Sequence, residues 1–212
     1  MKGVQFGAYH SYDDLQLILT SKQLGSPAVK ENKIDIPGAD SALDLTDFFG
    51  EPKYNDTVHK FEFSTMVPHK EFPTQFSRIK NAIHGKRLRI ILDDDPAFFY
   101  WGRCNVSAFT SAKGIGTVSV ECDCEPYKYK VSKTVVSATV SGTQAITLTN
   151  SRKRAVPEIT TTATMTIAFD GGSTTANAGT FTIPELELVE GENVVTVTGA
   201  GTITFTWQEG DM

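Results

Sequence analysis

The stretch Thr117-Val118-Ser119-Val120-Glu121-Cys122-Asp123-Cys124 alternates apolar and polar residues without a break. In a β-strand successive side chains point to opposite faces of the sheet. The two valines and two cysteines therefore share one face, and the serine and the acidic residues share the other. This pattern predicts a half-buried strand in a sheet that has an apolar core on one side.

Neighbouring stretches repeat this strand signal on both sides. The alternation over Phe61–Val67 predicts another half-buried strand, and Leu15–Leu19 reads as a strand rich in leucine. Residues 26–38 read as a strand followed by a turn. Leu88–Leu92 and Phe98–Arg103 flank the acidic turn at residues 93–96, which predicts a β-hairpin.

One helix interrupts these strands. Phe72, Phe76, Ile79 and Ile83 are spaced by four, three and four residues, which places them on a single helical stripe. Gly85 follows, where a left-handed cap costs least. We expect a helix over about Thr74–His84, with ends uncertain by roughly two to four residues.

The composition changes near residue 131 and divides the chain into two modules, 1–130 and 131–212. The first carries 16 Lys and Arg against 17 Asp and Glu, and the second carries 4 against 8. Threonine supplies 19 of the last 82 residues, and no helical periodicity is seen there.

The second module is a series of short apolar segments separated by turn residues. Its evenly spaced strands predict a β-sandwich or barrel. In the last segment Ile203, Phe205 and Trp207 share one face, which favours burial of the tryptophan in the core. The predicted strands are Val135–Val140 and Ala145–Leu148 around a turn at 141–143, Thr164–Phe169 before a turn at 170–172, Thr180–Ile183, Val194–Thr198 and Thr202–Trp207.

The overall charge argues against a nucleic-acid-binding protein. The 212 residues carry a formal charge of −5 and have a pI near 5.4, whereas proteins that bind the phosphate backbone are basic. The N-terminus has no apolar stretch typical of a signal peptide, and no window has the roughly 18 apolar residues of a membrane helix. We expect a chain made and folded in a cytoplasm.

The three cysteines, Cys104, Cys122 and Cys124, are an odd number and give no disulfide framework. Cys122 and Cys124 would need further metal ligands, and no CxxC motif or histidine pair is near them. We expect buried structural thiols.

The acidic turn Asp93-Asp94-Asp95 permits two interpretations. Clustered carboxylates are the ligands that hard cations prefer, but aspartate before a proline also commonly begins a turn, which we favour. The histidines at 10, 59, 69 and 84 have no ligand or triad spacing, and no GxSxG, HExxH or Walker motif is present. We therefore predict no enzyme, no metal and no cofactor.

The basic segment His84–Arg89 follows the predicted helix. It lies at a helix C-terminus, which has the wrong polarity for anion binding. We expect these side chains to pair with acidic groups of the same subunit or of a neighbouring one.

Aromatic residues are dense in the first module. In a strand, Phe98-Phe99-Tyr100-Trp101 must place aromatic rings on both faces of the sheet. Either both faces are covered or one face contacts a partner, which favours oligomerisation. The aromatic set is Phe48, Phe49, Tyr54, Phe98, Phe99, Tyr100, Trp101, Tyr127 and Tyr129.

Four segments come in the order found in one protein family. They are Asp44–Tyr54, Ile83–Lys86, Leu92–Pro96 with Tyr100–Arg103, and Cys124–Tyr129. The chain resembles the siphophage distal tail proteins, which are baseplate or tail-tip components of phages and prophages, over essentially its full length.

This resemblance implies a mainly β fold: an N-terminal β-sandwich or split-barrel-like domain with one α-helix over residues 1–130, and a C-terminal galectin-like β-sandwich over 131–212. It implies a structural protein of the virion tail tip that forms a ring, commonly a hexamer. The ring would join the tail tube protein to the tail-associated hub protein. The second module, at 82 residues, is too compact for the arms that carry receptor-binding proteins in some relatives.

The predicted subunit contacts lie in two places, the segment 48–54 and the strand 98–103. Two rival functions remain open at this point. A carbohydrate-binding module could stack a sugar on Trp207 or another exposed aromatic ring, and a cell-wall hydrolase would need paired carboxylates across a cleft. The interface residues we select are Phe48, Phe49, Lys53, Tyr54, Phe98, Tyr100, Trp101 and Arg103.

Overall fold

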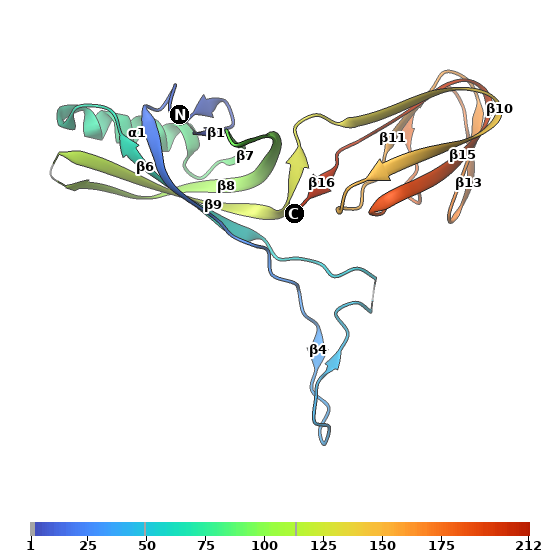
Figure 1. Cartoon of the computed structure of the whole chain (residues 1–212), viewed down its shortest axis with the longest axis horizontal. Coiled ribbons are helices and arrows are strands. Elements are labelled where there is room, and N and C mark those ends of the chain that lie inside the picture. Colours follow the sequence, from blue (N-terminus) through green and yellow to red (C-terminus); the bar gives the residue numbers. More distant parts are fainter. Residues whose placement is uncertain (1–2, 49, 113) are drawn as a thin grey trace. The chain divides into compact units, whose positions relative to one another are not determined.

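A computed structural model describes residues 3–48, 50–112 and 114–212 and shows a mainly β protein. The described part of the chain contains one α-helix and one short 3-10 helix, which confirms the predicted fold class. It forms two compact units, Met1–Pro126 and Tyr127–Met212 (Figure 1). The division falls close to the predicted change of composition. No helix of the described residues is long and apolar enough to cross a membrane.

The first unit is built on one antiparallel sheet with the strand order β2-β1-β7-β8-β9-β6-β3. Its strands are β1 (Val4–Phe6), β2 (Tyr9–His10), β3 (Leu17–Leu24), β6 (Thr57–Thr65), β7 (Arg87–Leu92), β8 (Asp95–Ala112) and β9 (Ile115–Lys130).

Strand β9 contains the alternating stretch at 117–124 and has the predicted faces. Val118, Val120, Cys122 and Cys124 are all fully buried, whereas Ser119 and Glu121 are only half-buried and Asp123 is exposed. The buried face meets Phe61 and Phe63 of the neighbouring β6 in one apolar core. The half-buried strand predicted at Phe61–Val67 corresponds to the C-terminal part of β6 and the residues just after it.

Helix α1 (Phe72–Ile83) packs against this core after the 3-10 turn η1 (His69–Glu71). The predicted stripe is correct, because Ile79 and Ile83 are fully buried. The helix begins two residues earlier than predicted, since a proline is tolerated in the first helical turn and Pro73 occupies that position. Gly85 has φ +73° just beyond the end of the helix, as the sequence suggested.

A long arm, residues 25–56, leaves the sheet between β3 and β6 and carries the short strands β4 (Lys33–Ile34) and β5 (Leu43–Asp44) (Figure 1). No described residue between 25 and 56 is buried. The strand predicted over 26–38 is thus largely wrong: only Lys33–Ile34 is a strand, because the rest of this segment lacks a continuous partner strand.

The second unit contains two very long strands, β10 (Thr134–Asn150) and β15 (Gly191–Trp207), which pair along their whole length. Strand β12 pairs with the first half of β15 and β11 with the second half. The remaining strands are β11 (Glu158–Thr161), β12 (Met165–Phe169), β13 (Gly172–Ala176), β14 (Gly179–Thr182) and β16 (Gly210–Asp211), the last of which pairs with Lys128 and Tyr129 of β9.

One predicted turn and one predicted break between strands do not occur. The turn expected at 141–143 lies inside β10, and the break expected after Thr198 lies inside β15. Gly142 has open space around it, whereas Gly201 permits a close approach, since a Cβ there would lie 2.7 Å from the Thr162 hydroxyl. The turn predicted at 170–172 is correct, because β12 and β13 form a hairpin there.

Both halves of β15 contribute to a single core. Val195 and Val197 come from the first half, and Ile203, Phe205 and Trp207 from the second. The opposite face carries hydroxyl pairs between strands, such as Thr143 with Thr198 at 3.0 Å. The second unit therefore has an apolar core of its own.

Candidate functional site

The aromatic strand β8 has rings on both of its faces, as its sequence requires. Tyr100 faces the core side and meets the ring of His59 edge-on at 4.5 Å. Phe99 and Trp101 lie on the other side and contact each other edge-to-face at 5.7 Å. Phe98 and Trp101 are half-buried.

Arginine side chains of β7 cover this second aromatic face. The Arg89 guanidinium lies 4.6 Å from the Phe99 ring centroid and 5.3 Å from that of Trp101. Arg87 lies 5.7 Å from the Trp101 ring and also forms a salt bridge with Glu125. Such cation–π contacts attract a cation to the negative ring face. The pairing of Arg87 with an acidic group agrees with the prediction for the segment His84–Arg89.

Arg103, at the end of the predicted interface strand, has a structural contact of its own. Its guanidinium donates a hydrogen bond to the backbone carbonyl of Gly85 at 2.7 Å. His84 accepts a hydrogen bond from the Val106 backbone at 3.1 Å, so it ties the helix end to β8. Both contacts fix the loop after α1 to the strand that carries the aromatic residues.

The other predicted interface residues lie on the arm. Phe48 is 71% exposed, Lys53 is exposed and Tyr54 is half-buried. The Lys53 carbonyl accepts a hydrogen bond from the Lys30 amide at 2.7 Å, and Tyr54 pairs with Val29 in an isolated bridge. Phe49 lies outside the described residues. The predicted residues thus form two groups on separate elements of the first unit.

The three cysteines are buried and free, as expected. The Cys122 thiol donates to the Cys104 sulfur at 2.8 Å, and this hydrogen bond together with burial raises the pKa of Cys122 far above its ordinary value. Burial likewise raises the pKa of Cys124. Protonated, inaccessible thiols are poor nucleophiles and poor metal ligands.

The acidic turn sends its carboxylates to different partners. Asp93 accepts a hydrogen bond from the Gly3 amide at 2.6 Å and contacts the His10 ring, whereas Asp94 forms an ion pair with Lys22. The described residues include no group of three or more His, Cys, Asp or Glu side chains placed to hold a metal ion.

His59 is a buried histidine at the base of the arm. It is 1% exposed, and its Nδ1 accepts a hydrogen bond from the Gly25 amide at 3.2 Å. Burial lowers the pKa of His59 below its ordinary value of 6.5. The ring is therefore neutral at pH 7 and holds the first residue of the arm.

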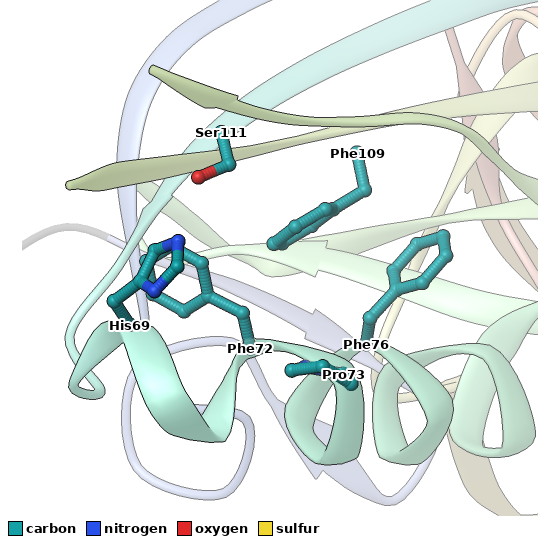
Figure 2. A pocket seen from close by; sticks show the side chains of 6 residues that line it. All are labelled: His69, Phe72, Pro73, Phe76, Phe109 and Ser111. Carbon is teal, nitrogen blue, oxygen red and sulfur yellow. The ribbon is translucent and has the colours of Figure 1, made fainter. Parts of the chain in front are cut away.

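An open aromatic pocket of about 300 Å³ lies between α1 and β8 (Figure 2). The ring of Phe109 stands 4.9 Å from that of Phe76 and 5.6 Å from that of Phe72. His69, Pro73 and Ser111 complete the lining. Sequence reasoning missed this pocket: it treated Phe72 and Phe76 as core residues and did not single out Phe109.

In the second unit, Trp207 is 2% exposed and belongs to the core, as its alternation with Ile203 and Phe205 predicted. It offers no platform for a sugar. The described residues of this unit include no exposed aromatic side chain. A cavity of about 310 Å³ lies near Phe169, Asp170 and Asn193.

The crystal structure of the Dit protein of phage SPP1, described as a paradigm of the hub adsorption apparatus in phages that infect Gram-positive bacteria, is similar over 100% of both chains, with a TM-score of 0.75. The chain has the fold of SPP1 Dit. The two sequences are 12% identical, so the likeness concerns the fold. No protein-family model matches the chain, and a comparison with curated protein sequences finds no match.

This finding confirms, for the fold, the resemblance to distal tail proteins that the sequence suggested. The similarity spans both units and does not end at the boundary near residue 126. The interface residues on the arm and on β8 remain predictions.

Proposed function

We propose that the chain is a structural subunit of a phage tail tip that assembles into a ring, most simply a hexamer, at the distal end of the tail. The observation that carries this proposal is the likeness to SPP1 Dit over the whole of both chains. Similarity over one unit alone would fit many β-rich proteins, because folds are shared among unrelated functions.

The first unit is the ring-forming part in this proposal, and the second is the galectin-like domain. The ring would bind the tail tube protein on one side and the tail-associated hub protein on the other. The chemistry of the described residues supports a structural role: the cysteines are buried, and the acidic turn is divided between separate partners.

The arm and strand β8 are the proposed subunit contacts. The arm exposes Phe48 without a core beneath it, and β8 presents Trp101 at a partly covered face. Different surfaces that meet head to tail form a ring when the rotation between copies closes. The arm and β8 could supply such a pair of surfaces.

The solution mass, measured by light scattering and supported by negative-stain images, tests this function. We expect rings of about six copies with a central hole. Trp101→Glu should lower the oligomer mass, because it replaces the indole side chain that Arg87 and Arg89 contact with a charged group. Val194→Glu, at an exposed site of the second unit, should leave the mass unchanged. A wild-type chain that stays monomeric at high concentration and binds neither neighbouring tail protein would contradict the proposal.

The carbohydrate-binding alternative loses its main support, because Trp207 is buried. A glycan screen with the wild-type chain serves as its direct test. Binding that disappears on substitution of Asn193 or Asp170, beside the cavity of the second unit, would return that function to consideration.

A further inference from the structure

Two of the three buried cysteines lie close enough to react with each other. Cys104 of β8 and Cys122 of β9 come from neighbouring strands of the first sheet, and both are fully buried in its core. Their sulfur atoms are 2.8 Å apart, and the sulfur–sulfur bond of a disulfide is about 2.05 Å long. A small movement of the two side chains would therefore bring the sulfurs to bonding distance.

The register of the two strands selects this pair and leaves the third cysteine aside. Cys104 contacts Cys122, and two residues away on each strand Gly102 meets Cys124, since a Cβ on this glycine would lie 2.5 Å from the Cys124 sulfur. Residues that face each other in an antiparallel pair have Cα atoms about 4.5–5.5 Å apart. Disulfides span Cα distances of about 4.4–6.8 Å, so the backbone can stay in place when the bond forms.

A metal ion fits these sulfurs less well than a disulfide does. A structural zinc site needs four ligands. Among the residues that the structure describes, no group of three or more His, Cys, Asp or Glu side chains is placed to hold an ion. A bond between two sulfurs needs no further ligand.

We propose that Cys104 and Cys122 form a cross-strand disulfide that locks β8 to β9 when the chain meets a small-molecule disulfide such as oxidised glutathione. The thiolate of one cysteine attacks the small disulfide, forms a mixed disulfide and releases one small thiol. The second cysteine then attacks the mixed disulfide and releases the other. The two cysteines are oxidised, the small disulfide is reduced, and the two cysteine protons end on the two small thiols.

The exchange begins while the thiols are accessible. In the folded chain, the hydrogen bond to Cys104 and burial raise the pKa of Cys122, so this thiol stays protonated and is a poor nucleophile. During folding, or when β8 and β9 open locally, both thiols meet the solvent. A tail tip leaves the reducing cytoplasm with the virion, and disulfides persist on virion surfaces. This use of the bond rests on the proposed function, but the formation of the bond does not.

Refolding in a glutathione buffer tests whether the bond forms. The full wild-type chain is unfolded in urea with a reductant, refolded with reduced and oxidised glutathione, and alkylated in denaturant. We expect alkylation of Cys124 alone, whereas refolding without the small disulfide should leave all three cysteines alkylated. Cleavage before Asp123 separates Cys122 from Cys124, so a peptide map identifies the partner of Cys104.

Single serine variants are the matched controls. Cys124→Ser should keep the cross-link, whereas Cys104→Ser and Cys122→Ser should each retain two alkylated cysteines. The midpoint of urea unfolding gives a second readout, because a disulfide restricts the unfolded chain. Oxidation should raise the midpoint of the wild type and of Cys124→Ser, and it should leave that of Cys104→Ser unchanged.

Three results would each overturn the proposal. Three alkylated cysteines in a wild-type chain that has refolded cooperatively would mean that the two thiols remain hydrogen-bonded only. A bond to Cys124 would mean that the register does not select the partner. A cross-linked chain with an unchanged midpoint would mean that the bond does not lock the strands. None of these results bears on the proposed ring, which the solution mass tests separately.

Discussion

The β10–β15 pair and the arm, residues 25–56, are both long segments in which two stretches of chain run side by side. They differ in whether other residues cover their side chains. Strands β10 and β15 pair over 17 residues each, and their inward side chains, among them Leu148, Ile203 and Phe205, are fully buried. The arm has only the short β4–β5 ladder and the Val29–Tyr54 bridge, and none of its described residues is buried.

The difference teaches that strand pairing alone does not make a stable segment here. Backbone hydrogen bonds replace bonds to water and contribute modestly, whereas burial of apolar area supplies most of the stabilisation. The β10–β15 pair finds its apolar cover inside its own unit. The arm exposes comparable side chains, such as Ile34 and Leu43, which its own unit does not cover.

The largest effect should follow from Phe205→Ala in the core of the second unit. Removal of a fully buried ring loses transfer free energy and leaves a cavity, which costs about 3–5 kcal/mol. The free energy of unfolding in urea measures the loss. Val194→Ala on the same strand, where the side chain is 57% exposed, should change it by less than about 0.5 kcal/mol. Equal effects would show that the pair does not depend on its core.

A smaller difference in stability should distinguish substitutions at two of the glycines in the β10–β15 pair. Gly201→Ala places a Cβ 2.7 Å from the Thr162 hydroxyl and 3.1 Å from the Met165 methyl, at φ +146°. We expect a loss of about 2 kcal/mol. Gly142→Ala has φ +95° but open space around it, so about 1 kcal/mol is expected. A larger loss at Gly142 would contradict the close approach at Gly201.

Predictions from the sequence were most successful where a segment had a single clear periodicity of apolar residues, either that of a strand or that of a helix. The alternation at 117–124 and the stripe through Ile79 and Ile83 each had a single structural solution. The predictions failed at Gly142 and Gly199, because glycine is common in chain reversals but also occurs inside strands, where it permits a positive φ or a close approach. They also failed on the arm, since the alternation over 26–38 resembles that of a core strand and only the tertiary structure shows that nothing covers it.

Only part of the candidate site was predicted, because local sequence patterns reveal strands and their faces but not contacts between distant residues. The density of aromatic residues at 98–101 pointed to a two-sided strand, and the structure shows two such faces. The pocket forms where Phe109 of β8 contacts Phe76 of α1. These residues are far apart in the sequence, so no local pattern predicts their contact. The arginine cover over Phe99 and Trp101 could not be predicted either, because it requires the β7–β8 register.

A substitution of Glu209 tests how much its hydrogen bonds stabilise the C-terminal end of the second unit. Burial alone would raise its pKa, but hydrogen bonds from Lys130, Ser151 and Thr134 outweigh that effect and the pKa is lowered. Glu209→Gln should cost about 2 kcal/mol near neutral pH. A carboxylate with a lowered pKa stabilises the fold above its ordinary pKa of 4.5, and this is lost as the pH falls through the folded value.

The difference in stability between the wild type and Glu209→Gln should therefore shrink as the pH falls below 4.5. Urea unfolding at pH 7 and at pH 3.5 checks this. A difference that stays constant with pH would mean that the carboxylate charge is unimportant. Glu190→Gln, at an exposed site of the same unit, is the control.

A substitution of His59 tests how the buried histidine at the base of the arm affects stability at different pH values. Because its pKa is lowered by burial, the unfolded chain takes up a proton near pH 6.5 while the folded chain does not. The stability of the first unit should fall as the pH drops below about 6.5, by at most about 1.4 kcal/mol per pH unit. His59→Gln should flatten that dependence between pH 6.5 and 5. His69→Gln, at an exposed residue, should leave it in place.

The smallest effect on stability should come from the arm itself. Ile34→Ser with Leu43→Ser replaces two half-exposed side chains that have no core beneath them, so the unfolding free energy of the monomer should change by less than about 0.5 kcal/mol. The same variant should lose the oligomer, as measured by light scattering. Lys33→Ser with Asp44→Ser alters the opposite side of the same two-residue ladder and should retain the oligomer.

This last pair of variants separates the two kinds of segment most sharply. If the apolar side of the arm stabilised the monomer, the two serine substitutions would lower its unfolding free energy as a core change does, and the arm would be an ordinary part of the first unit. If the substitutions lower the oligomer mass but not the unfolding free energy of the monomer, the apolar area on the arm stabilises only contacts between molecules. The same chemistry that holds β15 within one chain would then hold the arm against the next.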